Sequence, residues 1–228
     1  MNKASRLFGA TVLLALVASF SASADLKKIK PPKDKHKLSL SYRPAANAAL
    51  PRKYDASLGV LPVADLRGMK FYGGEDEYFE ESPVDAFSTA LYSELKFSQI
   101  FRQVRRVNSA VPDRLSPASL EPIAQSNSVD LLLVVYLTEF GLRREKMEEG
   151  KKGVDYQINV HVSFFGQLLH PASGTVVWAE EITRDFGSLN TSGKIEPLEY
   201  TNNAIEAMKV SFDDMKAMIL ATGMEMGR

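Results

Sequence analysis

The sequence contains no cysteine among its 228 residues. This absence excludes disulfide bonds, thiolate metal sites and cysteine nucleophiles, and it excludes a lipid anchor of the bacterial lipoprotein type. Histidine is scarce, with three residues, and none of them lies in an H-E-x-x-H motif. Walker-type and G-x-S-x-G motifs are also missing from the sequence. We therefore expect no catalytic residue, no cofactor and no metal, and a fold that depends on its hydrophobic core.

Long apolar runs are also rare, and the first one belongs to a signal peptide pattern in residues 1–24. Lys3 and Arg6 give a basic start, residues 8–20 are apolar, and Ala22-Ser23-Ala24 supplies the small residues that signal peptidase needs. The apolar run is shorter than the roughly 20 residues of a spanning helix, although an uncleaved membrane anchor is the alternative. We expect cleavage near Ala24 and a periplasmic protein without a cysteine-linked lipid.

Residues 25–56 form a basic arm that we predict to be partly disordered. From Asp25 to Tyr54 there are nine Lys or Arg residues and only two Asp. Such a run is usually solvated, and the alternative is a surface tether to anionic lipid headgroups or to an acidic partner. The lysines assigned to this tether are Lys27, Lys28, Lys30, Lys33, Lys35 and Lys37. Aromatic and basic residues do not interleave here, so we expect no nucleic acid partner.

Residues 57–223 are predicted to form a single domain, followed by a tail at 224–228. A short strand near 38–42 precedes it, where apolar and polar residues alternate. Residues 57–66 predict a buried strand, with a bulge or an unpaired position at Pro62. Ser82 and Pro83 have the pattern of a helix start, and Val84, Phe87, Leu91 and Leu95 follow as an apolar stripe.

The second half of the chain alternates between strands and ends in a helix. Residues 100–107 predict an amphipathic strand, and a short helix follows near 117–124 in spite of Pro122. Residues 131–137 are continuously apolar, which predicts a strand covered on both faces. Residues 143–153 are expected to be a charged hairpin tip.

A strict alternation in residues 154–164 predicts a strand with one buried and one wet face. His161 falls on the wet face and is interpreted as a solvated or hydrogen-bonded strand residue. A return strand then spans 175–186, and Met208, Phe212 and Met215 belong to a closing helix. The element order β-α-β-α-β-β-β-α predicts an α+β domain. We expect a mixed sheet of about five strands with helices packed mainly on one face.

One stretch combines aromatic rings with acidic groups. Residues 70–81, KFYGGEDEYFEE, follow a predicted strand and precede a predicted helix. The stretch is interpreted either as a solvated connection or as a partner-binding surface anchored by its rings, while Ca²⁺ binding lacks the usual ligand spacing. The residues assigned to partner binding are Phe71, Tyr72, Glu75, Asp76, Glu77, Tyr78, Phe79 and Glu80.

The segments SLGVLPVADLRG, SPVDAFSTALYSEL and VDLLLVVYLTEF, in this order, resemble bacterial envelope proteins with the fold of the TolB amino-terminal domain, such as the LpoB, CsgG and PelC lipoproteins. The finish Asp65-Leu66-Arg67-Gly68 is similar to that of YajG-type lipoproteins. The resemblance implies a non-enzymatic envelope protein that binds other proteins. Those relatives are lipid-anchored, and this chain lacks the cysteine for such an anchor.

The pattern as a whole favours an exported periplasmic adaptor or accessory subunit of a cell-envelope assembly or transport system. Its expected partners are envelope proteins, and its oligomeric state, including a homo-oligomer, is left open. The alternative is a periplasmic carrier of a small apolar or lipid ligand, held between the sheet and the closing helix. A hydrolase is a third hypothesis, without a nucleophile or a metal constellation behind it.

Overall fold

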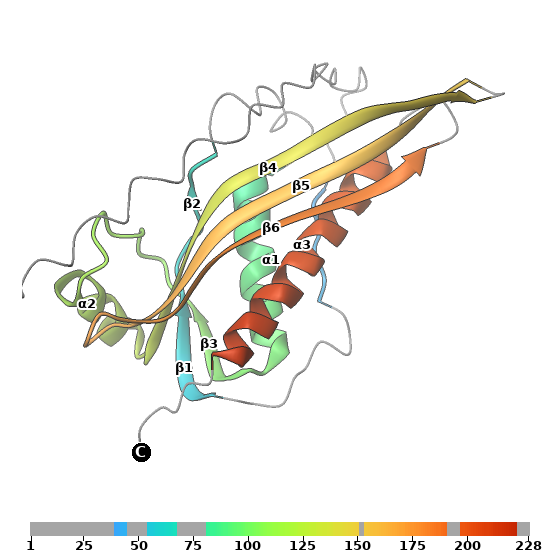
Figure 1. Cartoon of the computed structure of the whole chain (residues 1–228). Coiled ribbons are helices and arrows are strands. Elements are labelled where there is room, and N and C mark those ends of the chain that lie inside the picture. The colour runs from blue at the N-terminus through green and yellow to red at the C-terminus, as the bar shows by residue number, and fades with distance from the viewer. Residues whose placement is uncertain (1–38, 45–53, 68–80, 151–152, 191–196, 223–228) are drawn as a thin grey trace, which may run out of the picture.

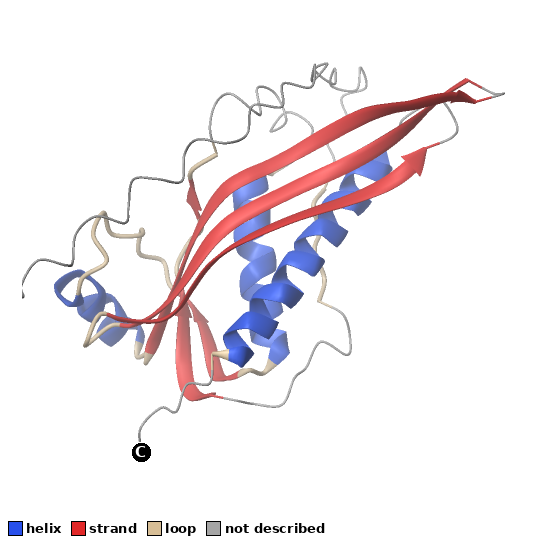
Figure 2. Ribbon diagram, viewed as in Figure 1, coloured by secondary structure: helices blue, strands red, loops and turns tan. Residues whose placement is uncertain are grey.

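The computed structural model describes residues 39–44, 54–67, 81–150, 153–190 and 197–222. These residues form an α+β fold with one mixed sheet and three helices (Figures 1 and 2). In chain order the elements are β1 (Tyr54–Val60), β2 (Ala64–Asp65), α1 (Pro83–Ser98), β3 (Phe101–Arg106), α2 (Pro117–Asn127), β4 (Leu131–Gly150), β5 (Gly153–His170), β6 (Thr175–Asn190) and α3 (Pro197–Ala221). The predicted fold class is confirmed.

The strand order in the sheet is β3-β1-β4-β5-β6, and the short β2 pairs with β4 beyond the end of β1. β1 runs parallel to both of its neighbours, so that Leu58 lies opposite Val104 on one side and Leu131 on the other. β4, β5 and β6 form an antiparallel meander. The sheet of the described residues has six strands, and the strand added to the expected five is β2.

Pro62 divides the strand predicted over 57–66 into β1 and β2. Leu61 still donates its backbone N–H to the carbonyl of Leu133 at 3.1 Å, and Leu66 donates to Leu137 at 2.8 Å. Pro62 has no N–H to donate, so the pairing is interrupted at this residue. The expected irregularity at Pro62 is therefore confirmed.

The charged run at 143–153 contains the predicted hairpin connection, but most of the run belongs to the two strands and not to the tip. β4 continues to Gly150 and β5 begins at Gly153, with Arg143 paired to Asn159 and Lys146 to Tyr156. Charged side chains are compatible with an antiparallel ladder because one sheet face can be solvated. The result is a long projection of β4, β5 and β6 away from the parallel strands (Figure 1). We call residues 137–150, 153–165 and 181–190 the antiparallel arm.

Two apolar layers cover the sheet unequally. α1 and α3 lie side by side on one face (Figure 1) and contribute Phe87, Leu91 and Phe212 to the main core. α2 lies on the other face, where Leu120 and Ala124 pack with Leu61, Val107, Leu132, Val134 and Leu169. This second layer reaches the sheet only around the parallel strands and the start of β4. The expectation that helices pack mainly on one face is confirmed.

The main core is filled by aromatic rings between the sheet and α3. Phe87 of α1 contacts Phe164 of β5 at 5.2 Å and Phe212 of α3 at 5.0 Å between ring centroids. Met208, Phe212 and Met215 are fully buried. The closing helix thus uses its methionine stripe for packing, as methionines at helical spacing usually do.

Residues 39–44 pack on the helical layer without forming the strand predicted near 38–42. Leu40 is buried in the main core, and the ring of Tyr42 contacts Phe212 edge-on at 5.7 Å. The structure gives these residues no strand pairing. Alternation alone does not make a strand, because a ladder also needs a neighbouring edge, and this segment lies against helices.

A buried polar cluster joins that segment to both helices. Tyr42 donates its hydroxyl to Glu94 of α1 at 2.6 Å, and Lys216 of α3 donates to the other Glu94 oxygen at 2.5 Å and to Asp213 at 2.7 Å. Burial, together with the Glu94 hydrogen bond and negative charge, raises the pKa of the Tyr42 phenol. Burial acts to lower the pKa of Lys216, but its bonds to Asp213 and Glu94 outweigh this and raise it. The cluster therefore holds a charged lysine inside the protein.

Candidate functional site

The residues assigned to partner binding at 71–80, and the tether lysines at 27–37, lie outside the described residues. What the structure describes is the chain on either side of the aromatic stretch. β2 ends at Asp65, and Arg67 donates to its carboxylate in a two-pronged contact of 2.9 Å at each prong. These bonds to Arg67 lower the pKa of Asp65, against the effect of burial. The contact between Asp65 and Arg67 is thus a local interaction at the end of β2.

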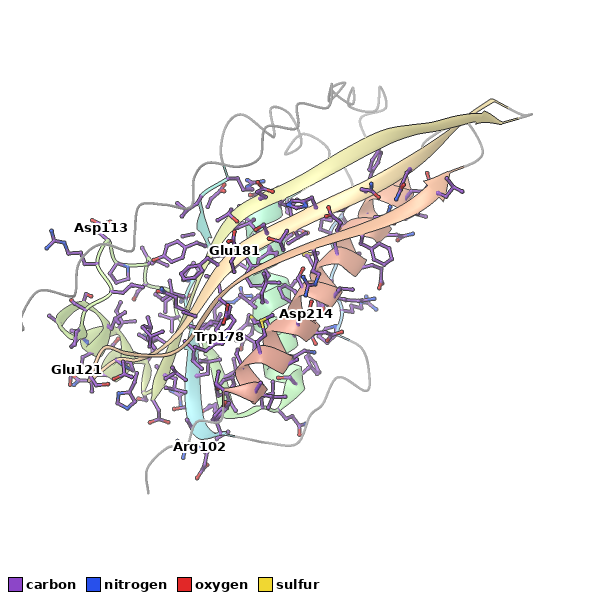
Figure 3. All side chains as sticks on the ribbon, in the orientation of Figure 1. Arg102, Asp113, Glu121, Trp178, Glu181 and Asp214 are labelled. Atoms are coloured by element: carbon purple, nitrogen blue, oxygen red, sulfur yellow. The ribbon has the colours of Figure 1, made fainter. Side chains whose placement is uncertain are left out.

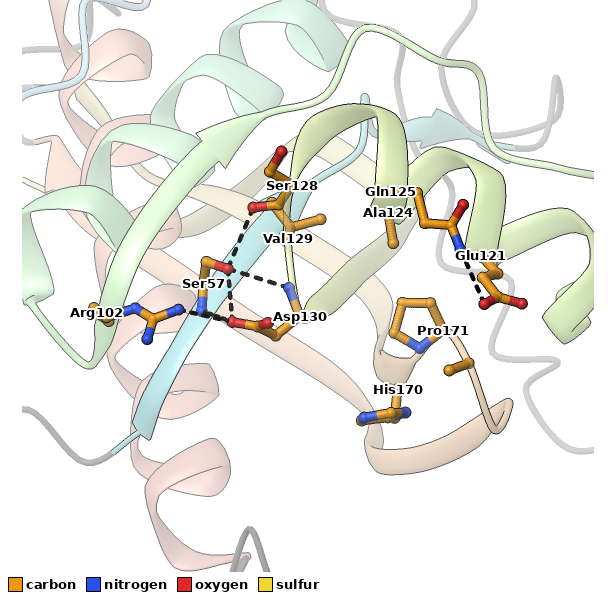
Figure 4. A pocket seen from close by; sticks show the side chains of 11 residues that line it. Ser57, Arg102, Glu121, Ala124, Gln125, Ser128, Val129, Asp130, His170 and Pro171 are labelled. Atoms are coloured by element: carbon orange, nitrogen blue, oxygen red, sulfur yellow. Dashed lines mark hydrogen bonds and ion pairs between the residues drawn. The ribbon is translucent and has the colours of Figure 1, made fainter. Parts of the chain in front are cut away.

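A pocket of about 430 Å³ lies between α2, the start of β4 and the turn after β5 (Figure 4). Its wall brings together Ser57, Asp130 and His170, the three residue types of a hydrolase triad. Ser57 donates its hydroxyl and its backbone N–H to the same Asp130 oxygen, each at 2.7 Å. Arg102 donates to that oxygen at 3.1 Å. This cluster is the first place to test for catalysis.

The cluster does not have the geometry of a triad. In a triad the histidine accepts the serine proton and the aspartate orients the histidine, whereas here Asp130 binds Ser57 directly. His170 lies apart from both in Figure 4, and its Nδ1 is 3.2 Å from the Ser173 hydroxyl. The backbone N–H and hydroxyl of Ser57, followed by Arg102, lower the pKa of Asp130. The arrangement ties β1 to the start of β4, which is a structural role.

A different polar cluster lies on the antiparallel arm, on the face opposite α1 and α3. The His161 ring on β5 lies between two carboxylates, with Nε2 at 2.5 Å from Glu139 of β4 and Nδ1 at 2.7 Å from Asp185 of β6. The cluster crosses all three strands of the arm and links them through side chains.

Hydroxyl groups continue this cross-strand linkage beside His161. Ser163 lies 3.1 Å from the Thr138 hydroxyl and 2.9 Å from the Thr183 hydroxyl, and it donates to Glu181 at 3.4 Å. Glu181 and Thr183 are exposed on β6 (Figure 3 labels Glu181). The side chain of Asp185 is 58% exposed. Together with His161 and Glu139, these residues form what we call the open face of the arm.

The open face is only partly predictable from the sequence. Of the two interpretations of His161, the hydrogen-bonded one is confirmed, but the expected wet face is buried at His161 and Ser163. The alternation in β5 indicates that these two residues share a face. Nothing in the sequence indicates that Glu139 and Asp185 meet His161, because the register of β4 and β6 is a tertiary property.

The described residues offer little for metal or membrane chemistry. In that part of the chain no group of three or more His, Asp or Glu residues is arranged to hold a metal ion. Among the helices of the same part, none has the length and hydropathy to cross a membrane.

No family model matches the chain, and no curated protein matches its sequence. Among solved structures, the fold is similar to that of the protein XCC0632 from Xanthomonas campestris, of family DUF330. The TM-score is 0.53 at 12% identity, covering 81% of this chain and 94% of that one. This likeness is one of fold.

Two further similarities have lower scores. The PelC dodecamer from Paraburkholderia phytofirmans has a TM-score of 0.39 at 18% identity, covering 71% of this chain and 90% of that one. The LpoB C-terminal domain from Salmonella enterica has a TM-score of 0.30 at 12% identity, covering 60% and 87%. These two similarities describe architecture alone.

Proposed function

We propose that the protein is an exported, periplasmic, non-enzymatic adaptor of a cell-envelope assembly or transport system, acting by protein–protein binding. The observation that carries the proposal is the open face of the arm. Glu139, Glu181 and Asp185 place three carboxylates there, and α2, which covers this face of the sheet, packs only near the parallel strands. Three carboxylates against one histidine favour a partner with a basic surface, since complementary charge steers and orients an encounter.

The aromatic stretch at 71–80 remains a second part of the proposed interface. It connects β2 to α1, and both of these elements are fixed to the rest of the fold. Its four rings are the type of residue that anchors protein interfaces, and its carboxylates have the same sign as those of the open face. A single basic partner would therefore be attracted by both surfaces.

The packing of the main core weighs against the alternative of an apolar carrier. Such a carrier needs an unfilled space beneath Met208, Phe212 and Met215. Phe87 and Phe164 occupy the volume next to Phe212, with ring centroids 5.0 and 6.4 Å away. Contacts of this kind are those of a close-packed interior.

Site-specific photo-crosslinking in intact cells tests the open face. A photoreactive residue is placed at Glu181 or Thr183, and as a matched control at Glu121 of α2, which is not part of the open face. We expect discrete cross-linked products at 181 and 183 and none at 121. Equal products at all three positions, or none at any of them, would contradict binding through the open face.

Removal of the four rings tests the aromatic stretch. A variant with Phe71, Tyr72, Tyr78 and Phe79 all changed to Ser should lose the cross-linked products and keep the thermal transition of the wild type. A large fall in the transition temperature would show that the rings belong to the core instead. Release of the processed chain by osmotic shock checks its periplasmic location, and retention of the unprocessed chain in the cytosol would contradict it.

A further inference from the structure

A second pocket, of about 340 Å³, lies at the carboxyl ends of β1 and β3. Its wall combines residues at the ends of these two strands with one side of α1, including Asp85, Thr89 and Tyr92. Val60, Leu61 and Val107 also border the pocket, but they are almost fully buried, so the other residues form its accessible wall. The pocket is separate from the arm, so the binding of a ligand there would be a function in addition to the proposed adaptor role.

The topology of the sheet places this pocket where open sheets usually bind ligands. β1 leads into α1 on one sheet face, whereas its neighbour β3 leads into α2 on the other face. The polypeptide therefore leaves these two adjacent parallel strands toward opposite faces of the sheet. Such a switch point leaves a crevice outside the carboxyl ends of the strands, which is a general binding position in sheets of this kind.

Of the three arginines of β3, one lines the pocket and is available to bind a ligand. Arg102 is paired with Asp130, and Arg105 donates to the carbonyl of Asn127 at 2.8 Å. Arg106 lines the pocket and stacks on the Tyr92 ring, with its guanidinium carbon 4.8 Å from the ring centroid. Among the described residues it has no hydrogen-bonding acceptor. A cation–π contact uses no hydrogen-bond acceptor, so among the described residues the N–H groups of Arg106 have no partner.

Other donors in the pocket are also without acceptors among the described residues. Ser88 accepts the backbone N–H of Val63 at 3.4 Å, which leaves its own hydroxyl hydrogen to donate. The side chains of Thr89 and Asn108 make no hydrogen bond to the described residues, and both line the pocket. A guanidinium surrounded by hydroxyl and amide donors is suited to an anionic oxygen group.

The charge balance selects the kind of anion. Asp85 is the one carboxylate among the described lining residues. Its negative charge opposes a dianion such as phosphate more strongly than a single carboxylate, whose two oxygens match the guanidinium fork. We propose that this pocket binds the carboxylate of a small ligand, between Arg106 and the donors of Ser88, Thr89 and Asn108. The ligand is either a free organic acid or the end of a peptide chain.

Titration by nuclear magnetic resonance tests this site on the purified, isotope-labelled protein. The probes are hexanoate, acetyl-Ala-Ala-Leu with a free carboxylate, the amides of both compounds, and inorganic phosphate. The signals followed are the Arg106 side-chain N–H and the backbone amides of Thr89 and Asn108. We expect saturable shifts with a dissociation constant of about 1 mM, as for a small ligand held by one fork and a few contacts.

Lys96 provides a matched control for Arg106. Both cations stack on the Tyr92 ring, with the Lys96 ammonium 5.8 Å from the centroid, but only Arg106 lines the pocket. Arg106→Gln should weaken binding about tenfold or more, whereas Lys96→Gln should change it less than about twofold. Arg106→Lys keeps the charge and loses the fork, so its affinity should lie in between. Arg106 is exposed, and we expect all three variants to fold.

The outcomes separate the two sources of the carboxylate. Binding of hexanoate alone identifies a free acid, binding of the peptide acid alone identifies a chain end, and binding of both shows that the carboxylate suffices. Binding of the amides or of phosphate as strongly as the acids would overturn the proposal. So would equal losses in the Arg106→Gln and Lys96→Gln variants, or no saturable shift with any acid.

Discussion

The two halves of the sheet differ in how they are covered. Around β1, β3 and the start of β4, α1 packs on one face and α2 on the other, and Leu131 to Val135 are all almost fully buried. Along the antiparallel arm, α3 packs on one face, and the other face carries Glu139, His161 and Asp185. The parallel half is held by apolar contact on both sides, and the arm is held by apolar contact on one side and polar linkage on the other.

This difference separates stability from recognition. In β1 and the start of β4, which are covered on both faces, nearly every side chain is used in packing and little surface is left for a partner. The arm keeps one face with exposed carboxylates while the opposite face, with Val160, Val162 and Phe164, secures it to the core. A surface for binding can thus vary without unfolding the domain.

The largest effect is expected where a charge is buried instead of exposed. Lys216→Met leaves Glu94, which is 3% exposed, without its ion-pair partner. The free energy of unfolding should fall by about 3–5 kcal/mol, as for other broken buried pairs. Arg184→Met breaks the half-exposed pair with Asp214 that joins β6 to α3, and should cost under about 1 kcal/mol. Urea unfolding measures both values.

A double variant keeps this prediction falsifiable. Removing both charges, in Glu94→Leu with Lys216→Met, should restore much of the loss, because replacing a whole buried pair by apolar groups is often nearly neutral. Equal losses for Lys216→Met and Arg184→Met would contradict the distinction between the two pairs.

Leu132 and Ser163 compare the two halves on the same sheet face. Leu132→Ala leaves a cavity between β4 and α2, and the free energy of unfolding should fall by about 2–5 kcal/mol. Ser163→Ala removes hydroxyl contacts with Thr138 and Thr183 on the arm, at a cost of about 1 kcal/mol. Chemical denaturation again provides the measurement. A larger loss at Ser163 would mean that the arm depends on its polar linkage for stability.

Two glycines test the same comparison by adding a methyl group instead of removing atoms, and the expected loss of stability is smaller. A Cβ at Gly59 would lie 2.8 Å from Leu132 and 3.0 Å from Val107 and Val129. Gly59→Ala therefore overpacks the doubly covered half, and we expect a loss of about 1–3 kcal/mol. A Cβ at Gly187 on the arm meets the Oδ1 atom of Asn159, at the end of a side chain that can rotate away. Gly187→Ala should change the unfolding midpoint little, and an equal loss at both positions would be evidence against this contrast.

The smallest effect concerns pH and the link between β1 and β4. The bonds from Ser57 and the charge of Arg102 lower the pKa of Asp130 from its ordinary 3.8. The folded pKa is below the unfolded one, so the stabilisation is present above the unfolded value and is lost as the pH falls through the folded value. The urea midpoint of the wild type should therefore fall more, below about pH 5, than that of Asp130→Asn. Parallel curves for the two proteins would contradict this link.

The local pattern of the sequence predicts helix starts and turns well, because neighbouring residues alone decide them. Ser82 accepts the N–H of Val84 at the start of α1, as its position before Pro83 indicates. The turn at 170–174 closes with a bond from Gly174 to His170 at 2.8 Å, and Gly174 has a φ of +68°, which glycine adopts without strain. Caps and turns are decided within a few residues, so neighbouring residues suffice to identify them.

The local pattern fails where a distant segment decides the outcome. The alternation of Leu40 and Tyr42 indicates a strand, but these residues pack against helices and Tyr42 binds Glu94, which lies 52 residues away. The charged run after Leu142 indicates a tip, but the ladder with β5 carries it into the arm. In both cases the deciding neighbour is remote in the chain.

What the sequence determined by itself is the class of the protein: an α+β chain without cysteine, with continuous apolar strands where two faces are buried and alternating strands where one is. These features depend on the period of side chains along a single strand or helix. Only the tertiary structure decided that His161 lies between Glu139 and Asp185 and that Lys216 is buried against Glu94. It also decided that Arg106, which has no acceptor among the described residues, lines a pocket. Each depends on strand register or helix packing, which bring together residues far apart in the sequence.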